Sequence, residues 1–236
     1  MATYVFVAGG GWGGFIWREV ASRLRTLGHD VFTPTLTGVG ERVHLASPQI
    51  DLSTHVQDIL GVLEYEDLHE VILVGHSYGG LVITGVAERV PERLAQLVYL
   101  DALVPQDGQS GWDVTDPALR ARIEERVRTQ GDGWRLLPPR DAPARITAHP
   151  HTPLLQKLLI KNPAAARLPH TFVSCTQNQA GRLTMDPIAA RVRAEGWGYY
   201  EVEADHMAML TAPQAVVDIL LEIAAAPSLQ SFRETG

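Results

Sequence analysis

The chain has very little cysteine, and Cys175 is the only one among its 236 residues. A single cysteine excludes an internal disulfide and fits a compartment that is reducing or indifferent to redox state. Because Cys175 ends a strand-like run, we expect a buried structural thiol rather than a reactive one. No apolar stretch approaches membrane-spanning length, and the start MATYVFVAGG indicates a strand without a basic leader or cleavage site. We therefore expect a cytoplasmic protein.

Runs of lysine and arginine are also missing. The net charge is −7 and the pI is about 5.7, which argues against nucleic acid and anionic membranes as partners. No H-x-x-x-H pair or carboxylate cluster supports a metal site, and we expect no cofactor. The sequence gives no indication of the oligomeric state.

What the chain does contain is the alternation typical of an α/β protein. Short apolar runs alternate with amphipathic segments, which favours βαβ units and a parallel sheet. We expect about six strands with helices on both faces of the sheet, and the length suits one sizeable core. Gly28 should end the first helix, and Ser53 or Thr54 should cap the second. Strands are predicted at residues 3–8, 30–33, 71–74, 97–101, 170–175 and 198–202, and helices at 14–27, 53–67, 81–90, 117–130 and 213–223.

Residues 105–169 break this alternation. They contain nine of the 15 prolines, together with Trp112 and Trp134. We expect a core formed by residues 1–104 and 170–236, with 105–169 as a cap over the carboxyl ends of the strands, where ligands bind in this architecture. The alternative is that residues 105–169 are only a long surface loop and do not cover the binding edge of the sheet. The two tryptophans are candidates for the wall of a substrate pocket, as are four leucines whose spacing is also typical of simple packing: Leu154, Leu155, Leu158 and Leu159.

The segment EVILVGHSYGGLVITGVAERV, residues 70–90, carries the strongest functional pattern. A buried-type strand is followed by G-x-S-x-G, formed by Gly75, Ser77 and Gly79, and then by apolar residues at helical spacing. Strand, tight turn and helix are the context in which this motif indicates a nucleophile elbow. Glycines fit there because a Cβ would collide with the neighbouring strand or helix. The turn should expose the Ser77 hydroxyl at a helix N-terminus, where developing negative charge is favoured.

A serine hydroxyl needs a base to remove its proton, and nine histidines compete for that role. His206 follows the last predicted strand in a short loop before the final helix, so we predict that His206 is the base. His76 should point into packing. His149, His151 and His170 lie in or beside the insertion and could line a pocket, but we expect them in solvated loops. The remaining histidines are expected at the surface or in supporting positions: His29, His44, His55 and His69.

The acid that orients the base is the least certain member of the set. The loop after the strand at 170–175 offers only the amides of residues 177–179. The next carboxylate, Asp186, is more simply explained as a helix cap. Asp101 ends the strand that follows Ser77, where a buried charge needs a partner such as an imidazolium. We predict Asp101 as the acid, with Asp186, or no true acid, as the alternatives.

The glycine-rich loop after the first strand permits two interpretations. As part of an oxyanion hole it would supply the backbone N–H of Gly10, together with the N–H of Tyr78 after the nucleophile. The same loop also matches the dinucleotide-binding pattern G-x-G-x-x-G, with Gly9, Gly11 and Gly14 as its three glycines. The acidic residue expected at the end of the second strand is absent from VFTPTLTG. An NAD(P)-dependent oxidoreductase is therefore a remote alternative.

Three segments of the chain resemble a known family: GWGGFIWREVASRLRTLGHDVFTPTLTGVGERVHL, THVQDILGVLEYEDLHEVILVGHSYGG and ADHMAML. They are similar to the α/β-hydrolases that group plant methylesterases and hydroxynitrile lyases with bacterial carboxylesterases. The resemblance spans about residues 3–110 and 196–225. It implies an α/β-hydrolase fold with a Ser-His-acid esterase-type site under a cap, and Ser77 and His206 match its nucleophile and histidine.

The chain departs from this family at three places. Ala8 stands where the family usually has a histidine that buttresses the oxyanion loop, and the usual acid position is empty. Asp101 falls where the related haloalkane dehalogenases carry their acid. Met207 and Gly10 occupy the places of the lysine and threonine of the hydroxynitrile lyases, so ester hydrolysis is favoured over cyanohydrin cleavage.

The predicted function is that of a serine hydrolase. It would cleave a carboxylic ester or lactone of a small apolar or aromatic substrate through an acyl-enzyme. A lyase or a non-catalytic ligand receptor on the same fold is the alternative.

Overall fold

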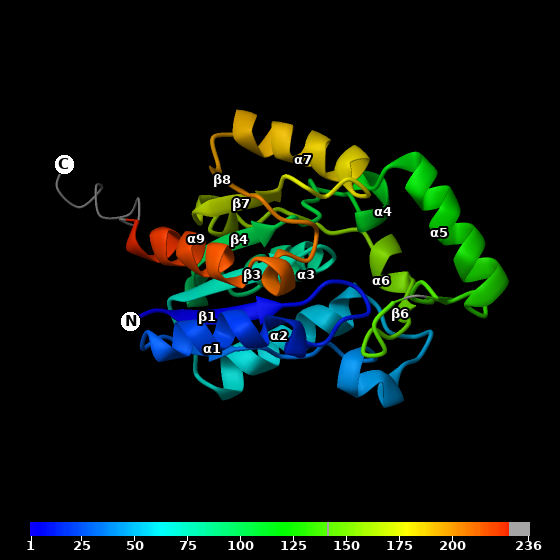
Figure 1. Cartoon of the computed structure of the whole chain (residues 1–236), viewed down its shortest axis with the longest axis horizontal. Helices are drawn as coiled ribbons and strands as arrows, with labels where there is room; N and C mark the ends of the chain where they lie inside the picture. Colours follow the sequence, from blue (N-terminus) through cyan, green and yellow to red (C-terminus); the bar gives the residue numbers. More distant parts are fainter. Residues whose placement is uncertain (141, 227–236) are drawn as a thin grey trace.

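We describe the protein from a computed structural model that covers residues 1–140 and 142–226. Its centre is a six-stranded sheet in the order β2-β1-β3-β4-β7-β8 (Figure 1). Every pairing in this sheet is parallel, which confirms the predicted architecture. The strands are β1 (Thr3–Val7), β2 (Asp30–Phe32), β3 (Val71–His76), β4 (Leu94–Leu100), β7 (His170–Cys175) and β8 (Gly198–Val202).

Helices cover both faces of the sheet because the central strands are apolar on both faces. Along β3, Val71 and Leu73 face one apolar cluster, whereas Ile72 and Val74 face another. This alternation is the period of two that a strand imposes on its side chains. The first cluster is completed by α2 (Leu52–Tyr65), α3 (Gly79–Ala87) and α7 (Arg182–Ala194), and the second by α1 (Arg18–Thr26), α8 (Ala208–Thr211) and α9 (Pro213–Ala225).

Two predicted helix starts were wrong. The helix expected at residues 14–27 begins as a 3-10 turn, η1 (Gly14–Trp17), and becomes α-helical only in α1. Helix α2 is capped by Asp51 rather than by Ser53 or Thr54. The Asp51 carboxylate accepts the Thr54 N–H at 2.8 Å while the Thr54 hydroxyl reaches back to the Asp51 N–H. This reciprocal pair satisfies two backbone donors at the start of the helix.

The described part of residues 105–169 contributes no strand to the main sheet. Its two short strands pair with each other in antiparallel fashion. The elements of this segment are α4 (Gly111–Val114), α5 (Pro117–Gln130), β5 (Arg135–Leu136), β6 (His149–Pro150), α6 (Thr152–Leu155) and η4 (Ala165–Arg167). In Figure 1, α4, α5, α6 and β6 lie beyond the end of the sheet toward which the strand arrows point. Two further 3-10 turns, η2 (Gly40–Leu45) and η3 (Pro91–Arg93), belong to the other part of the chain. The C-terminal residues 227–236 of the predicted core lie outside the described residues.

The order of the strands determines where a ligand can enter. The chain runs from β1 to the edge strand β2 and then returns to β3 on the other side of β1. The loops that leave β1 and β3 therefore diverge and open a crevice at the carboxyl edge of the sheet, the usual binding position in such folds. None of the helices in the described ranges is long and apolar enough to cross a membrane.

Candidate active site

Ser77 occupies a sharp turn between β3 and α3. Its backbone φ is +55°, in the left-handed region that residues other than glycine rarely adopt. The glycines on either side fit because the backbones approach closely. A Cβ at Gly75 would lie 2.7 Å from the Gly79 carbonyl oxygen, and one at Gly79 would lie 2.7 Å from the Val7 carbonyl oxygen. The strand, turn and helix expected around the G-x-S-x-G motif are thus present.

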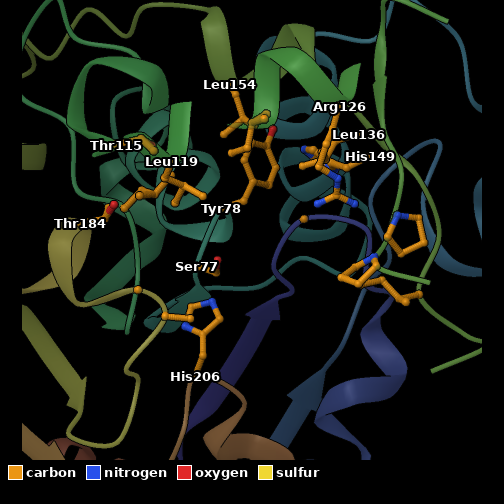
Figure 2. Close-up of a pocket in the computed structure, with 18 of the residues that line it drawn as sticks. Ser77, Tyr78, Thr115, Leu119, Arg126, Leu136, His149, Leu154, Thr184 and His206 are labelled. Carbon is orange, nitrogen blue, oxygen red and sulfur yellow. The ribbon is translucent and has the colours of Figure 1, made fainter. Parts of the chain in front are cut away.

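Ser77 and His206 line the same cavity, which has a volume of about 400 Å³. In Figure 2 the imidazole of His206 points toward the Ser77 hydroxyl from the loop after β8. Gly10, Tyr78 and His149 form part of the same wall. The remaining wall is mainly apolar and comes largely from residues 105–169 and α7; it includes Leu103, Trp112, Leu119, Ile123, Leu136 and Met185.

Asp101 contacts the far side of the His206 ring. Its Oδ2 atom lies 2.6 Å from His206 Nδ1, and the carboxylate is 1% exposed. A carboxylate can only accept, so Nδ1 carries the hydrogen and donates it, and Nε2 is left free to act as a base. Asp101 directly follows β4 with a φ of +44°, and its own N–H donates to the Val173 carbonyl oxygen at 2.8 Å.

Asn178 is a further partner of this carboxylate that sequence reasoning missed. Its amide nitrogen donates to Asp101 Oδ2 at 2.5 Å, while its amide oxygen accepts the Gly181 N–H at 2.9 Å. The second bond fixes which end of the amide faces Asp101. The Cys175 N–H adds a longer bond, 3.4 Å, to Asp101 Oδ1. Hydrogen-bond donors therefore reach both oxygens of this buried carboxylate.

Cys175 itself is buried, as predicted, and burial next to Asp101 raises the pKa of its thiol. The structure therefore favours a structural thiol at this position.

His76 supports the loop that carries His206. Its Nε2 donates to the His206 carbonyl oxygen at 2.8 Å, and its ring lies 4.6 Å from the His206 ring. Burial, and secondarily the neighbouring His206, lower the pKa of His76 well below its ordinary value. His76 is therefore neutral, and it points into packing as expected.

Tyr78 is anchored behind the position predicted for the oxyanion hole. Its hydroxyl lies 2.7 Å from His55 Nδ1, and His55 Nε2 lies 2.9 Å from the Thr37 carbonyl oxygen. Because the carbonyl can only accept, Nε2 carries the hydrogen of His55 and the Tyr78 hydroxyl donates to Nδ1. Burial raises the pKa of Tyr78 well above its usual value and lowers the pKa of His55. Both groups are uncharged at neutral pH.

His149 is where the sequence-based expectation was wrong. It was expected in a solvated loop but is 4% exposed and lines the cavity, with its ring 4.5 Å from that of Tyr78. The reason is the β5–β6 hairpin, which pairs His149 with Leu136 and directs this part of residues 105–169 onto the site. A proline-rich stretch gives no periodic signal of such a short hairpin.

Other predicted pocket residues divide into two groups. Trp112 and Leu154 line the cavity, but Trp134 is absent from its wall and instead packs with Arg135, whose guanidinium lies 5.4 Å from the indole ring. Leu155 and Leu159 are largely exposed. Leu158 is partly buried against the main core.

Asp186 is not the helix cap that we expected. It lies inside α7, where its carboxylate pairs with Arg182 at 3.2 Å, and Gly181 occupies the cap position instead. This exposed i,i+4 pair accounts for Asp186 without any part in the cavity.

Three buried histidines should make the stability of the fold depend on pH. Burial lowers the pKa of His55, His76 and His149 in the folded protein, whereas the unfolded chain holds them near about 6.5. Below that pH the unfolded state takes up protons that the native state excludes. The free energy of unfolding should therefore be highest above about pH 6.5 and should fall toward pH 5.5 with a slope approaching about 3 kcal/mol per pH unit from His76 and His149, to which His55 adds. Urea unfolding across this interval measures the slope, and a flat profile would contradict the prediction.

The described ranges 1–140 and 142–226 contain no group of three or more histidine, cysteine, aspartate or glutamate side chains arranged to hold a metal ion.

Comparison with known proteins places this geometry in context. A carbendazim hydrolyzing esterase from Nocardioides sp. (strain SG-4G) is 54% identical over 123 residues, and this alignment covers 52% of the chain and 51% of that esterase. The chain thus spans about half the length of this relative.

Solved structures match over nearly the whole chain. An extracellular α/β-hydrolase from a Paenibacillus species, described as sharing structural and functional homology with tobacco salicylic acid binding protein 2, superimposes with a TM-score of 0.82 at 27% identity. That match covers 94% of this chain and 98% of the other. A pyrethroid hydrolase from Sphingobium faniae JZ-2 has a TM-score of 0.69 at 19% identity, covering 96% and 98%, and shares the fold. The sequence profile of the alpha/beta hydrolase family matches residues 4–219. Because this match covers most of the chain and agrees with the parallel sheet and the tight turn at Ser77, the chain belongs to the alpha/beta hydrolase family.

Proposed function

We propose that the protein is a serine hydrolase that cleaves carboxylic esters through an acyl-enzyme. One observation carries the proposal. The Asp101 carboxylate lies 2.6 Å from His206 Nδ1, and His206 shares a cavity wall with Ser77. This arrangement supplies a nucleophile, a base with its free nitrogen available, and a buried acid that fixes the tautomer of the base. The Nocardioides relative is named as an esterase, and the Paenibacillus protein is described as an α/β-hydrolase.

The reaction follows from these positions. His206 Nε2 takes the Ser77 proton as Oγ attacks the ester carbonyl carbon, and Asp101 stabilises the imidazolium that forms. The tetrahedral oxyanion is bound by the backbone N–H groups of Gly10 and Tyr78. His206 then returns the proton to the alcohol, which departs and leaves Ser77 acylated. A water molecule, activated by the same imidazole, hydrolyses the acyl-enzyme and restores the serine.

The cavity favours an apolar substrate of modest size. Its volume of about 400 Å³ suits a small-molecule site. Among the described residues that line it, Arg126 is the only permanently charged side chain, and no carboxylate lines the wall. We therefore propose uncharged aromatic or aliphatic esters as substrates, with carbendazim included as a candidate because of the Nocardioides relative's name. Cationic esters should be poor substrates.

We further propose that residues 105–169 form a cap on the catalytic core. Helix α5 contributes Leu119, Ile123 and Arg126 to the cavity wall, and β6 contributes His149. Substrate selectivity would then depend on this insertion, while Ser77, Asp101 and His206 belong to the core.

Two measurements on the purified protein test the proposal. A fluorophosphonate probe should label Ser77 stoichiometrically, because labelling requires an activated hydroxyl. Hydrolysis should be detected on a panel of p-nitrophenyl acetate, neutral methyl esters, carbendazim, a lactone and a thioester, and a choline ester should be the poor member. Labelling without turnover on any member would favour a lyase on the same fold. No labelling and no turnover would favour a ligand receptor.

A further inference from the structure

The proposed oxyanion donor, Gly10, stands in the middle of three consecutive glycines, Gly9 to Gly11, directly after Ala8. None of these residues has a polar side chain that could hold the loop in place. Glycine loses more conformational freedom on ordering than any other residue. An oxyanion hole, however, requires a donor that is fixed before the reaction begins. Backbone hydrogen bonds and contacts with other segments must therefore hold the loop in place.

Contacts from the insertion hold both polar groups of the Gly11 backbone. The Gly11 N–H donates to His149 Nδ1 at 3.3 Å. The Gly11 carbonyl oxygen accepts the Thr147 N–H at 2.9 Å and the Thr147 hydroxyl at 3.1 Å. The Thr147 hydroxyl in turn accepts the Gly40 N–H at 2.9 Å. The loop is thus tied to a segment of the insertion that is remote from it in the sequence.

These bonds orient the neighbouring peptide groups. A trans peptide is planar, so fixing the Gly11 N–H fixes the plane of the peptide between Gly10 and Gly11. The preceding peptide is fixed as well, because the Gly9 carbonyl oxygen accepts the Trp12 N–H at 3.2 Å. The Gly10 N–H belongs to this second plane and points to the opposite side from the Gly9 carbonyl. Gly11 closes the turn with a φ of +78°, and a Cβ there would lie 2.5 Å from the Thr147 carbonyl oxygen.

His149 is suited to this task by its charge state. It accepts the Gly11 hydrogen at Nδ1, so the neutral ring carries its own hydrogen on Nε2. Burial lowers the pKa of His149 well below its ordinary value, which keeps Nδ1 available as an acceptor at neutral pH. The same ring packs edge-on against Tyr78, the second proposed donor residue. It also abuts Gly10, where a Cβ would lie 3.4 Å from the His149 Cγ.

We propose that Thr147 and His149 are positioning residues that clamp the oxyanion loop from the cap. The inference deepens the proposed ester hydrolase, on which it rests. It means that the cap does more than enclose the substrate, because the oxyanion hole is complete only when residues 147–149 are docked on Gly11. Neither residue transfers a proton or bonds to the reacting atoms.

A pair of isosteric substitutions isolates the contact. His149→Asn places an amide oxygen where Nδ1 stood and keeps an acceptor for the Gly11 N–H. His149→Gln instead places its polar group at the position of Nε2 and loses that acceptor. We expect kcat on p-nitrophenyl acetate to fall by up to about 10²-fold in His149→Gln with little change in KM, since an oxyanion donor is misplaced. His149→Asn should recover most of the lost kcat.

Two further readouts separate positioning from simple destabilisation. Inhibition by a trifluoromethyl ketone, whose serine adduct carries an oxyanion, should weaken in His149→Gln in parallel with kcat/KM. Amide hydrogen exchange in residues 9–13 should be faster in His149→Gln than in the wild type. The matched control is Gln156→Ala, which removes a different contact between the insertion and the core, the Gln156 bonds to Ser53. It should leave both readouts unchanged.

The possible outcomes are distinct. Equal losses in the Asn and Gln variants, unchanged exchange in residues 9–13, or the same losses in Gln156→Ala would each overturn the clamp. If His149→Gln fails to fold, Thr147→Val against Thr147→Ser asks the same question, because only serine keeps the hydroxyl that bonds Gly11. A wild-type protein without esterase activity would contradict the proposed function instead, and the exchange measurement would still decide whether the clamp holds the loop.

Discussion

Ser77→Ala should lower kcat on p-nitrophenyl acetate by on the order of 10⁵- to 10⁶-fold and leave KM nearly unchanged, the largest effect we expect from any single substitution. The alanine removes the atom that we propose forms the acyl-enzyme, and in that mechanism His206 and Asp101 cannot act on the carbonyl without it. Residual catalysis from the oxyanion hole and binding should remain. Steady-state kinetics with fluorophosphonate titration of active sites measures both the rate and the loss of labelling.

The fold should survive this substitution. Alanine at a φ of +55° carries the same Cβ as serine, so the backbone strain at position 77 is unchanged. Ser22→Ala, on the exposed face of α1, is the matched control and should retain wild-type activity. An active Ser77→Ala protein would show that the nucleophile lies elsewhere.

Asp101→Asn should reduce kcat by about 10⁴-fold. Two donors, His206 Nδ1 and the Asn178 amide, converge on Asp101 Oδ2. An asparagine offers one oxygen and one NH₂ group in place of two acceptor oxygens, so it favours the imidazole tautomer that carries its hydrogen on Nε2. In that tautomer the nitrogen facing Ser77 can no longer accept a proton. The substrate cavity is unaltered, so KM should change little.

The matched control for Asp101 is the alternative acid. Asp186→Asn removes a carboxylate that pairs with Arg182 on the surface of α7, and kcat should stay within about twofold of the wild type. A large loss in Asp186→Asn together with a small one in Asp101→Asn would reassign the acid. Equal wild-type rates in both variants would mean that His206 acts without either carboxylate.

The parts of this structure that could be predicted are those that depend on local sequence. Val71 to Val74 form a strand because four consecutive apolar residues suit a position buried on both faces, and Gly75 and Gly79 indicate the turn between them. The position of His206 in the same cavity as Ser77 could be predicted from its place between the last strand and the last helix. Asp101 could be proposed because a charge at a buried strand end needs a partner.

The parts that could not be predicted depend on contacts between distant segments. Asn178 is one of several amides in a loop, and only the folded chain shows that it donates to Asp101. His149 sits 138 residues from Gly11 in the sequence, within a stretch without periodicity. His55 gave no sign of its contact with Tyr78, because a histidine on a helix is as easily a surface residue. Trp134 lies in the same insertion as Trp112, but only the folded chain shows that its indole packs with Arg135 and is absent from the cavity wall.

The left-handed backbone at Ser77 and Asp101 has an implication for how this chain can evolve. Each non-glycine residue in that conformation costs roughly 1–2 kcal/mol, a sizeable share of the roughly 5–15 kcal/mol by which a typical domain stays folded. Glycine would relieve the strain at either position but would remove the side chain on which the proposed chemistry depends. Selection for stability alone would therefore replace the residues at both positions. In a descendant that no longer needs the proposed catalytic activity, we expect glycine to become common there.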